Sequence, residues 1–214
     1  MFLLLRMLIG CSDYSFSPPA DTNPGTDTLP PDTTIEEDTA EPVVIDTPDL
    51  DDCEDGFWAD YFNLPADHPD VEIDSAGLTT GDMPQNHDWY DEEYFVFQQL
   101  DPGLDYGSDW WPVDEGLPGD PLYFAVHWQA WLEVTEATVG AFEMGSDDDS
   151  WAFIDDEMVA DLGGIHGVEE TLFVVPLAPG LYKLDLYMAE RHSSQAGFWF
   201  TWETEGVGIY ACPE

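Results

Sequence analysis

The chain alternates between apolar and polar positions over most of its length after residue 120. In 124–134 (FAVHWQAWLEV), one face carries Phe, Val, Trp, Ala, Leu and Val, whereas His127, Gln129 and Glu133 lie on the other. A period of two predicts a β-strand with one buried face. Similar short runs predict strands at 139–144, 151–154, 157–162, 170–176, 181–190 and 197–203.

Turn signals separate these predicted strands, and no long helical pattern is present. The turns are marked by Gly145, 155–156, 163–164, 179–180 and 193–194. Short strands at regular spacing predict an all-β fold, an antiparallel β-sandwich or barrel. Residues 63–121 are instead rich in Asp, Gly and Pro with scattered aromatics. We expect long irregular loops there, with one or two short strands around 94–98 and the aromatics packed on the sandwich.

The first ten residues (MFLLLRMLIG) are apolar and too short to span a bilayer, which takes about 20 apolar residues. They are followed at once by Cys11 and polar sequence. Residues 8–11 (LIGC) resemble the bacterial lipoprotein signal, in which the cysteine is lipidated and becomes the mature N-terminus. The resemblance implies a signal peptide at 1–10 and a protein exported and lipid-anchored at Cys11 to the bacterial envelope, at the outer membrane or cell surface. The alternative is an ordinary cysteine after a buried strand.

Residues 11–52 form an acidic segment rich in Asp, Thr and Pro, without Lys or Arg. Such a segment buries too little apolar surface to offset its chain entropy. Proline and charge repulsion favour an extended chain. We therefore expect a disordered tether that carries a folded domain at 53–214.

Two cysteines bracket the predicted folded domain. Cys53 precedes its first strand and Cys212 follows its last. A disulfide between them would join the two ends, which fits an exported protein. The alternative is two free thiols.

The charge of the chain is extreme, with 47 acidic residues against 3 basic ones. Such a protein repels nucleic acid and anionic lipid, so both are excluded as direct partners of the folded part. Contact with a membrane would therefore run only through the lipid anchor. Two roles remain for the acids: they bind divalent cations, or they keep the protein hydrated at high salt.

Three of the acids are consecutive, Asp147, Asp148 and Asp149, between a glycine turn and an apolar strand. Adjacent carboxylates repel one another unless a cation or solvent offsets the repulsion. Calcium takes six to eight oxygen ligands, which carboxylates supply. We interpret the run as a calcium site; the alternative is a solvated turn.

Several segments resemble, in the same order, the lectin-like domain first named from anthrax protective antigen. The segments are 56–62 (GFWADYF), 104–111 (LDYGSDWW), 116–120 (GLPGD), 124–132 and 146–155. The C-terminal half is similar to the fibro-slime variant of that domain. It shares the acidic run, 161–167 (DLGGIHG) and 189–192 (AERH). The resemblance covers about 56–203 and implies a β-sandwich used outside the cell in adhesion and sugar recognition.

In lectin members of this family, two adjacent Asp joined by a cis peptide hold a calcium ion that also binds sugar hydroxyls. The resemblance therefore implies Asp147 and Asp148 as calcium ligands. The loop 190–195 would complete the site, with Glu190 as a third ligand; alternatively, Glu190 forms a salt bridge with Arg191 or faces solvent. This loop lacks the Asn that sugar-binding members often use.

Further residues are candidates with open roles. Asp149 stands where many lectin members have glycine, and it is a possible additional ligand. His166, His192 and Trp110 are candidates for ligand binding. For His166 the alternative is a hydrogen bond that caps its loop, and for Trp110 it is packing.

Motifs of common enzyme classes are missing from the sequence: a phosphate-binding glycine loop with Lys, His-Glu-x-x-His, Cys-x-x-Cys and Gly-x-Ser-x-Gly. The sequence thus predicts a non-enzymatic, lipid-anchored surface module that binds calcium and a glycan or another cell-surface or matrix component. One alternative is a structural envelope or matrix protein with a salt-adapted acidic surface. Another is a polysaccharide hydrolase, since paired carboxylates are abundant.

Overall fold

The structure, a computed structural model, describes residues 47–73 and 83–213, which belong to the compact unit Ile45–Glu214. The predicted signal peptide, Cys11 and most of the predicted tether lie outside the described residues. No helix in the described ranges is long and apolar enough to cross a bilayer.

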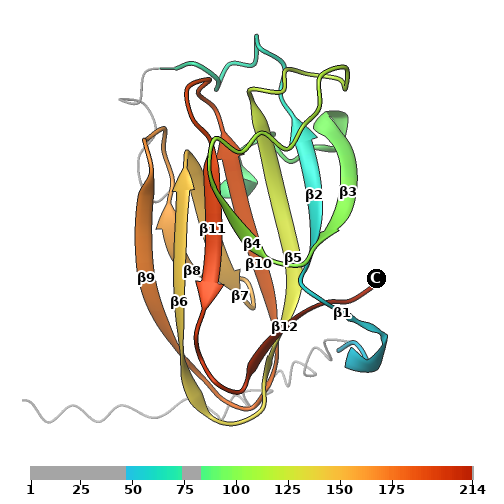
Figure 1. The fold of residues 1–214 in the computed structure, drawn as a ribbon, viewed down its shortest axis with the longest axis vertical. Helices are drawn as coiled ribbons and strands as arrows, with labels where there is room; N and C mark the ends of the chain where they lie inside the picture. The colour runs from blue at the N-terminus through green and yellow to red at the C-terminus, as the bar shows by residue number, and fades with distance from the viewer. Residues whose placement is uncertain (1–46, 74–82, 214) are drawn as a thin grey trace, which may run out of the picture. The chain divides into compact units, whose positions relative to one another are not determined.

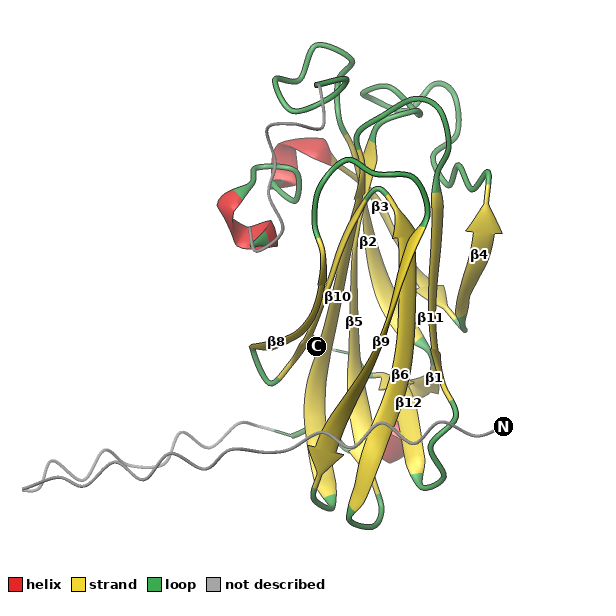
Figure 2. Ribbon diagram, turned by 90° about the vertical axis from the view of Figure 1, so that its left-hand side faces the viewer, coloured by secondary structure: helices red, strands yellow, loops and turns green. Residues whose placement is uncertain are grey.

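Two antiparallel sheets face each other across one core (Figures 1 and 2). The eight-stranded sheet contains β1 (Glu54–Asp55), β2 (Phe57–Asn63), β3 (Phe95–Asp101), β5 (Phe124–Val134), β7 (Asp149–Ile154), β8 (Glu157–Leu162), β10 (Gly180–Glu190) and β12 (Val207–Ala211). The four-stranded sheet contains β4 (Leu104–Ser108), β6 (Thr138–Asp147), β9 (Glu169–Leu177) and β11 (Gly197–Trp202). The predicted all-β antiparallel sandwich is confirmed.

Strand order places β5 and β10 at the centre of the large sheet. This sheet runs β1-β12-β5-β10-β7-β8, with β2 pairing with both β5 and β3, and the small sheet runs β4-β11-β6-β9. Three helical turns complete the described secondary structure: η1 (Leu50–Asp52), η3 (Pro84–Asn86) and η4 (Glu92–Tyr94). As expected, no long helix occurs in these ranges.

Buried and partly exposed side chains alternate along most of β5, as its sequence predicts, and the buried ones form part of the core. Val126, Trp128 and Leu132 are fully buried on the inner face, whereas His127, Gln129 and Trp131 are partly exposed on the outer face. Trp128 stacks on Phe198 of the opposite sheet with 4.4 Å between ring centroids. Such contacts between the inner faces bury a large aromatic surface and hold the two sheets together.

Described residues from 64–71 and 83–94 form a second layer on the outer face of the large sheet. In the side view of Figure 2 its helical turns lie beside the upper part of this sheet. Trp89 is fully buried there, and Tyr90 meets Tyr187 of β10 edge-on at 5.1 Å. This agrees with the expectation that the aromatics of the irregular region pack on the sandwich.

The sequence prediction missed β4, β12 and the two-residue strand β1, and it placed one or two short strands around 94–98, where β3 runs from Phe95 to Asp101. β4 and β12 are only five residues long and contain a glycine. Their conformation depends on pairing with strands distant in sequence. For example, Val207 lies opposite Val134.

Cys53 and Cys212 form the predicted disulfide, next to the pairing of β1 with β12. The bond encloses almost the whole sandwich, with a sequence separation of 159 residues.

Replacing Cys53 and Cys212 by Ser is expected to lower the free energy of unfolding by about 2–4 kcal/mol, because the open chain gains conformational freedom when unfolded. Urea unfolding measures this loss. Cys11→Ser, compared in chains that carry no lipid, is the control, since it removes a thiol without opening the ring. An unchanged midpoint in the double variant would contradict the prediction.

Candidate metal centre

The acidic run joins the two sheets at one end of the sandwich. Asp147 ends β6 in the small sheet and Asp149 begins β7 in the large sheet, so Asp148 alone connects them. The peptide bond between Asp147 and Asp148 is cis, as the resemblance implied. On either side of the run, Ser146 Oγ and Ser150 Oγ lie 2.7 Å apart in a buried hydrogen bond.

Gly145 lies in β6 shortly before this connection, and its backbone packs against an indole. A Cβ atom at this position would lie 2.0 Å from Cζ2 of Trp199, so the indole covers the bare backbone. A larger residue would displace this indole, which explains the glycine two residues before Asp147.

Asp147, Asp148 and Glu190 form a compact cluster of carboxylates. Each offers one oxygen, and these three oxygens lie within 4.8 Å of one another. The side chains are buried, with exposed fractions of 5%, 1% and 0%. Glu190 is the last residue of β10. It lies 42 residues after Asp148 in the sequence, and the fold brings it beside the acidic run.

Backbone groups orient two of these carboxylates. The N–H of His166 donates to Asp148 Oδ1 at 2.9 Å, and the N–H of Arg191 donates to Asp148 Oδ2 at 3.1 Å. The N–H of His192 donates to Glu190 Oε1 at 3.0 Å. Oδ2 of Asp147 and Oε2 of Glu190 are buried and have no hydrogen-bond partner in the described part of the chain.

The electrostatics of the cluster are unfavourable for three free carboxylates. Burial, followed by the charge of Asp148, raises the pKa of Glu190 to about 11. Burial also raises the pKa of Asp148 to about 6, although the two backbone N–H donors oppose the shift. The pKa of Asp147 is raised as well, again mainly by burial. Glu190 therefore holds a proton at neutral pH unless a positive charge stabilises its ionised form, and the same burial disfavours the charges of Asp147 and Asp148.

The oxygen-only donor set fits a hard divalent cation such as calcium. Three carboxylates in reach of one another supply the charge and several ligand atoms, and the two unpartnered oxygens are available without breaking a hydrogen bond. Asp147, Asp148 and Glu190 would therefore hold the ion.

Asp149 has a different role from its two neighbours. Arg191 Nε donates to Asp149 Oδ2 at 2.7 Å, and Arg191 Nη2 lies 2.7 Å from the same oxygen. Asp149 Oδ1 accepts the N–H of Gly164. The guanidinium also lies 4.6 Å from the ring centroid of Trp89, and its Nη1 donates to the carbonyl of Asp70 at 3.0 Å.

This buried ion pair bears on two interpretations of the sequence. The guanidinium of Arg191 already neutralises the charge of Asp149, and Asp149 is not part of the cluster formed by Asp147, Asp148 and Glu190. A ligand role for Asp149 stays a prediction. The alternative of a salt bridge between Glu190 and Arg191 is wrong, because the arginine pairs with Asp149 and Glu190 is fully buried.

Two further candidates from the sequence, His166 and His192, make hydrogen-bond contacts within their own loops. The ring of His166 contacts the carbonyls of Leu162 at 2.8 Å and Gly167 at 2.9 Å, which caps its loop. Burial opposes its charge, but these carbonyls raise the pKa of His166. His192 is partly exposed, and its Nδ1 lies 3.0 Å from Ser194 Oγ.

Trp110 is packed into the sandwich. Its ring stacks on Tyr106 at 4.1 Å and meets Phe124 edge-on at 5.4 Å. The structure thus shows the packing alternative for this residue. A ligand-binding role for His166, His192 and Trp110 stays a prediction.

Glu72, which the sequence analysis did not single out, contacts the loop that follows Glu190. Its Oε1 accepts from the hydroxyl of Tyr123 at 2.8 Å and from the N–H of Ser193 at 3.1 Å, and its own N–H donates to the carbonyl of Arg191 at 2.8 Å. These bonds tie the segment after β2 to the loop that follows Glu190. Hydrogen bonds, first from Ser193, lower the pKa of Glu72.

A second cluster of possible ligands, His68, Asp70 and Asp88, is satisfied by hydrogen bonds. The N–H of Asp70 donates to His68 Nδ1, so the ring proton resides on Nε2, which lies 3.1 Å from Asp88 Oδ1. Trp89 Nε1 donates to Asp70 Oδ2 at 2.9 Å. This arrangement leaves no lone pair on Nε2 for a metal.

No protein-family model matches the chain. By sequence, the chain is 29% identical to Protein psiR of Dictyostelium discoideum over 146 residues, which are 65% of this chain and 14% of the relative. It is 30% identical to Protein psiK of the same organism over 150 residues, 65% of this chain and 21% of the relative. The chain therefore spans less than a quarter of the length of these relatives.

Solved structures identify the architecture. The PA14 domain of MpAFP antifreeze protein superimposes with a TM-score of 0.56 at 14% identity, over 78% of this chain and 95% of that domain. The chain has a PA14-like fold. The PA14 sugar-binding domain from an RTX adhesin matches with a TM-score of 0.53 at 13% identity, over 72% and 94%. The finer assignment to the protective-antigen or fibro-slime variant stays a prediction.

Proposed function

We propose that this PA14-like domain is a calcium-dependent glycan-binding module of an exported surface protein. One observation carries the proposal: Asp147, Asp148 and Glu190 are buried together, with two unpartnered oxygens and raised pKa values. Burying carboxylates in this way is costly unless a cation compensates them. The expected lipid anchor at Cys11 is part of the proposal.

The surrounding chain is suited to holding such a centre in shape. The backbone N–H groups of His166 and Arg191 fix both oxygens of Asp148. The ion pair of Arg191 with Asp149 anchors the loop that follows Glu190. Two loops, 163–168 and 191–196, thereby border the cluster.

A bound calcium ion would supply open coordination positions for two neighbouring hydroxyls of a sugar. Support for a sugar as the ligand comes from the related fold of a domain described as the sugar-binding domain of an adhesin. The partly exposed His192 and the Glu72–Ser193 contact lie on the loop that a sugar would meet beside the ion. The domain is proposed to bind its ligand without catalysing a reaction.

Calorimetric titration of the metal-free full chain with calcium at constant ionic strength tests the proposal. We expect saturable binding with a dissociation constant in the micromolar to millimolar range. Since burial keeps a proton on Glu190 until the ion displaces it, affinity is expected to fall as the pH is lowered from about 8 to about 5. Absence of saturable binding, with stability that rises with sodium chloride alone, would favour the salt-adapted structural protein instead.

A glycan array probed with and without calcium tests the second half of the proposal. Calcium is expected to increase retention on at least one glycan, and excess EDTA is expected to remove this increase. Calcium binding without any calcium-dependent retention would leave a metal-stabilised structural module and contradict the glycan role. Turnover of the bound glycan would contradict the non-enzymatic role.

A further inference from the structure

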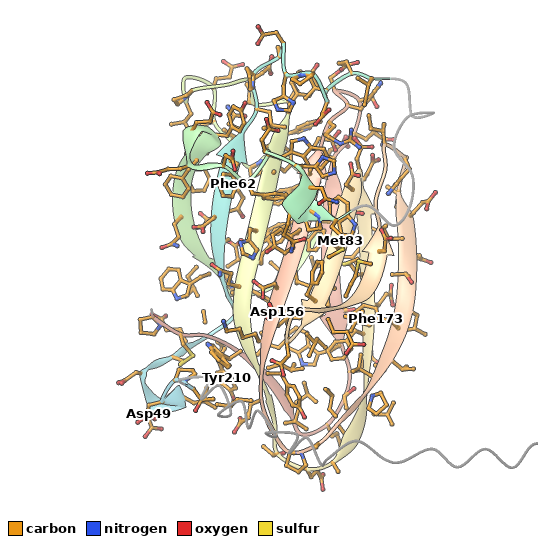
Figure 3. All side chains as sticks on the ribbon, turned by 180° about the vertical axis from the view of Figure 1, so that it is seen from behind. Asp49, Phe62, Met83, Asp156, Phe173 and Tyr210 are labelled. Atoms are coloured by element: carbon orange, nitrogen blue, oxygen red, sulfur yellow. A yellow bond between two sulfur atoms is a disulfide. The ribbon has the colours of Figure 1, made fainter. Side chains whose placement is uncertain are left out.

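The outer face of the large sheet is covered only in part. The segment that contains η3 and η4 packs over Trp151, Phe153 and Tyr187, and in the rear view of Figure 3 Phe62 and Met83 mark this covered upper part. The rest of the face carries a groove of about 820 Å³. Its border is formed by two short segments of chain, 47–48 and 212–213.

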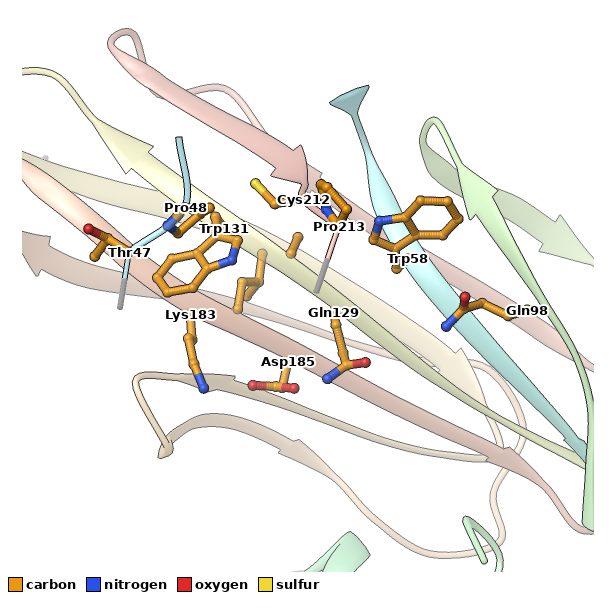
Figure 4. A pocket seen from close by; sticks show the side chains of 12 residues that line it. Thr47, Pro48, Trp58, Gln98, Gln129, Trp131, Lys183, Asp185, Cys212 and Pro213 are labelled. Carbon is orange, nitrogen blue, oxygen red and sulfur yellow. The ribbon is translucent and has the colours of Figure 1, made fainter. Parts of the chain in front are cut away.

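Strand register places the side chains of the groove in two neighbouring rows. Trp58 of β2 lies opposite Gln129 of β5, which lies opposite Asp185 of β10. In the next row, Trp131 lies opposite Lys183. These residues alternate with buried ones, so all of them project outward, as Figure 4 shows.

The two indoles are spaced for a chain-like ligand. Neighbouring strands lie about 4.8 Å apart, and residues i and i+2 of one strand lie about 6.8 Å apart, so the Cα atoms of Trp58 and Trp131 are separated by roughly 8 Å. Both side chains are partly exposed in the groove. Each offers a flat apolar surface that fits the C–H face of a pyranose ring.

Polar groups flank these indoles. Gln98 and Gln129 supply amide donors and acceptors, which match sugar hydroxyls at the edges of a stacked ring. Asp185 Oδ1 lies 2.7 Å from Nε2 of His127, whose ring stacks on Tyr187 at 4.1 Å. The Asp185 carboxylate is therefore held in place by its neighbours.

The local charge favours an uncharged ligand. Lys183 and Asp185 are two residues apart on the same face of β10, so their charges offset each other inside the groove. A polyanion would meet the repulsion of a chain with 47 acidic residues.

We propose that this groove is a second, metal-independent binding site for a neutral polysaccharide chain, with Trp58 and Trp131 as stacking platforms. Asp185 lies five residues before Glu190 on β10 and Lys183 seven, about 17 and 24 Å along the strand. The groove is thus separate from the metal centre, and it does not depend on the calcium site.

Affinity electrophoresis of the full chain in excess EDTA tests this site. The gels contain hydroxyethyl cellulose, xyloglucan, mixed-linkage β-glucan, galactomannan or pullulan as probes. Retardation by at least one of them is expected. Trp58→Ala and Trp131→Ala are each expected to weaken this binding about tenfold or more, since each removes a stacking surface.

Matched variants separate stacking from folding. Trp199→Ala removes a partly exposed indole from the outer face of the small sheet and is expected to leave retardation unchanged. Trp131→Phe keeps an aromatic face and is expected to recover part of the binding. The combined Asp147→Asn and Asp148→Asn variant is expected to retain it in full, which separates this site from the calcium-dependent one.

Three results would overturn the proposal. One is the absence of retardation by every probe in EDTA. Another is equal retardation of the wild-type chain, Trp58→Ala and Trp131→Ala. The third is binding that appears only after residues 1–46 are removed, which would make the chain's own N-terminal segment the occupant of the groove.

Discussion

Replacing Asp147 and Asp148 together by Asn is expected to weaken saturable calcium binding by about 100- to 1,000-fold, because the ion loses two charged ligands of a buried centre. Calorimetric titration at constant ionic strength measures the change. The calcium-dependent increase in glycan retention should disappear with it.

The same variant should still fold without metal, at a cost of about 1–3 kcal/mol, because asparagine at position 148 can accept only one of the two backbone N–H bonds that Asp148 accepts. Burial raises the pKa of both carboxyl groups, so the metal-free centre gains nothing from their charges. Urea unfolding in EDTA checks this point. It separates a specific loss of the ion from a general loss of structure.

Asp156→Asn is the matched control for this experiment. Asp156 is an exposed acid in the turn between β7 and β8, with a φ of 63°, a conformation that asparagine also adopts. It is expected to bind calcium as the wild-type chain does. If the double variant kept the wild-type affinity, the calcium would bind elsewhere among the acids.

Asp149→Ala is expected to lower the free energy of unfolding by about 3–5 kcal/mol, because it leaves the buried guanidinium of Arg191 without its ion-pair partner. Urea unfolding in EDTA measures this loss independently of the metal. Glu143→Ala, an exposed acid on β6, is the control and should change stability little.

A second substitution should repair much of this damage. Arg191→Met in the Asp149→Ala background removes the unpaired charge, and its side chain can still pack on Trp89. The double variant is therefore expected to be more stable than Asp149→Ala alone. A loss below about 1 kcal/mol in Asp149→Ala, as for an exposed ion pair, would contradict the structural role of this pair.

Local signals in the sequence were sufficient for most of the sandwich. The period-two pattern of 124–134 and 181–190 identifies strands because the alternation of side chains is a property of the strand itself. The turns at 155–156, 163–164 and 179–180 mark strand ends for a similarly local reason, whereas the turn predicted at Gly145 is wrong, because this glycine lies inside β6. Short strands such as β12, whose conformation relies on pairing with β5, give no such signal.

The sequence allowed the candidate site to be predicted only from residue types and from the positions of neighbouring acids along the chain. Consecutive acids, supported by a family resemblance, indicated Asp147 and Asp148, and the resemblance also indicated Glu190; the structure places these three carboxylates together. The sequence could not distinguish the roles of Asp147 and Asp148 from that of Asp149. The difference depends on Arg191, which follows β10 and pairs with only one of the three consecutive aspartates.

Local patterns and a family resemblance were sufficient to assign the all-β class, the outward and inward faces of the main strands, the disulfide partners and the position of an acidic centre. The folded chain was needed to show which acid of that centre Arg191 neutralises, and that Trp58, Trp131 and Asp185 line one groove. Both features have a common cause. Burial, ion pairing and strand register are relations between distant segments, and no single stretch of sequence contains both partners.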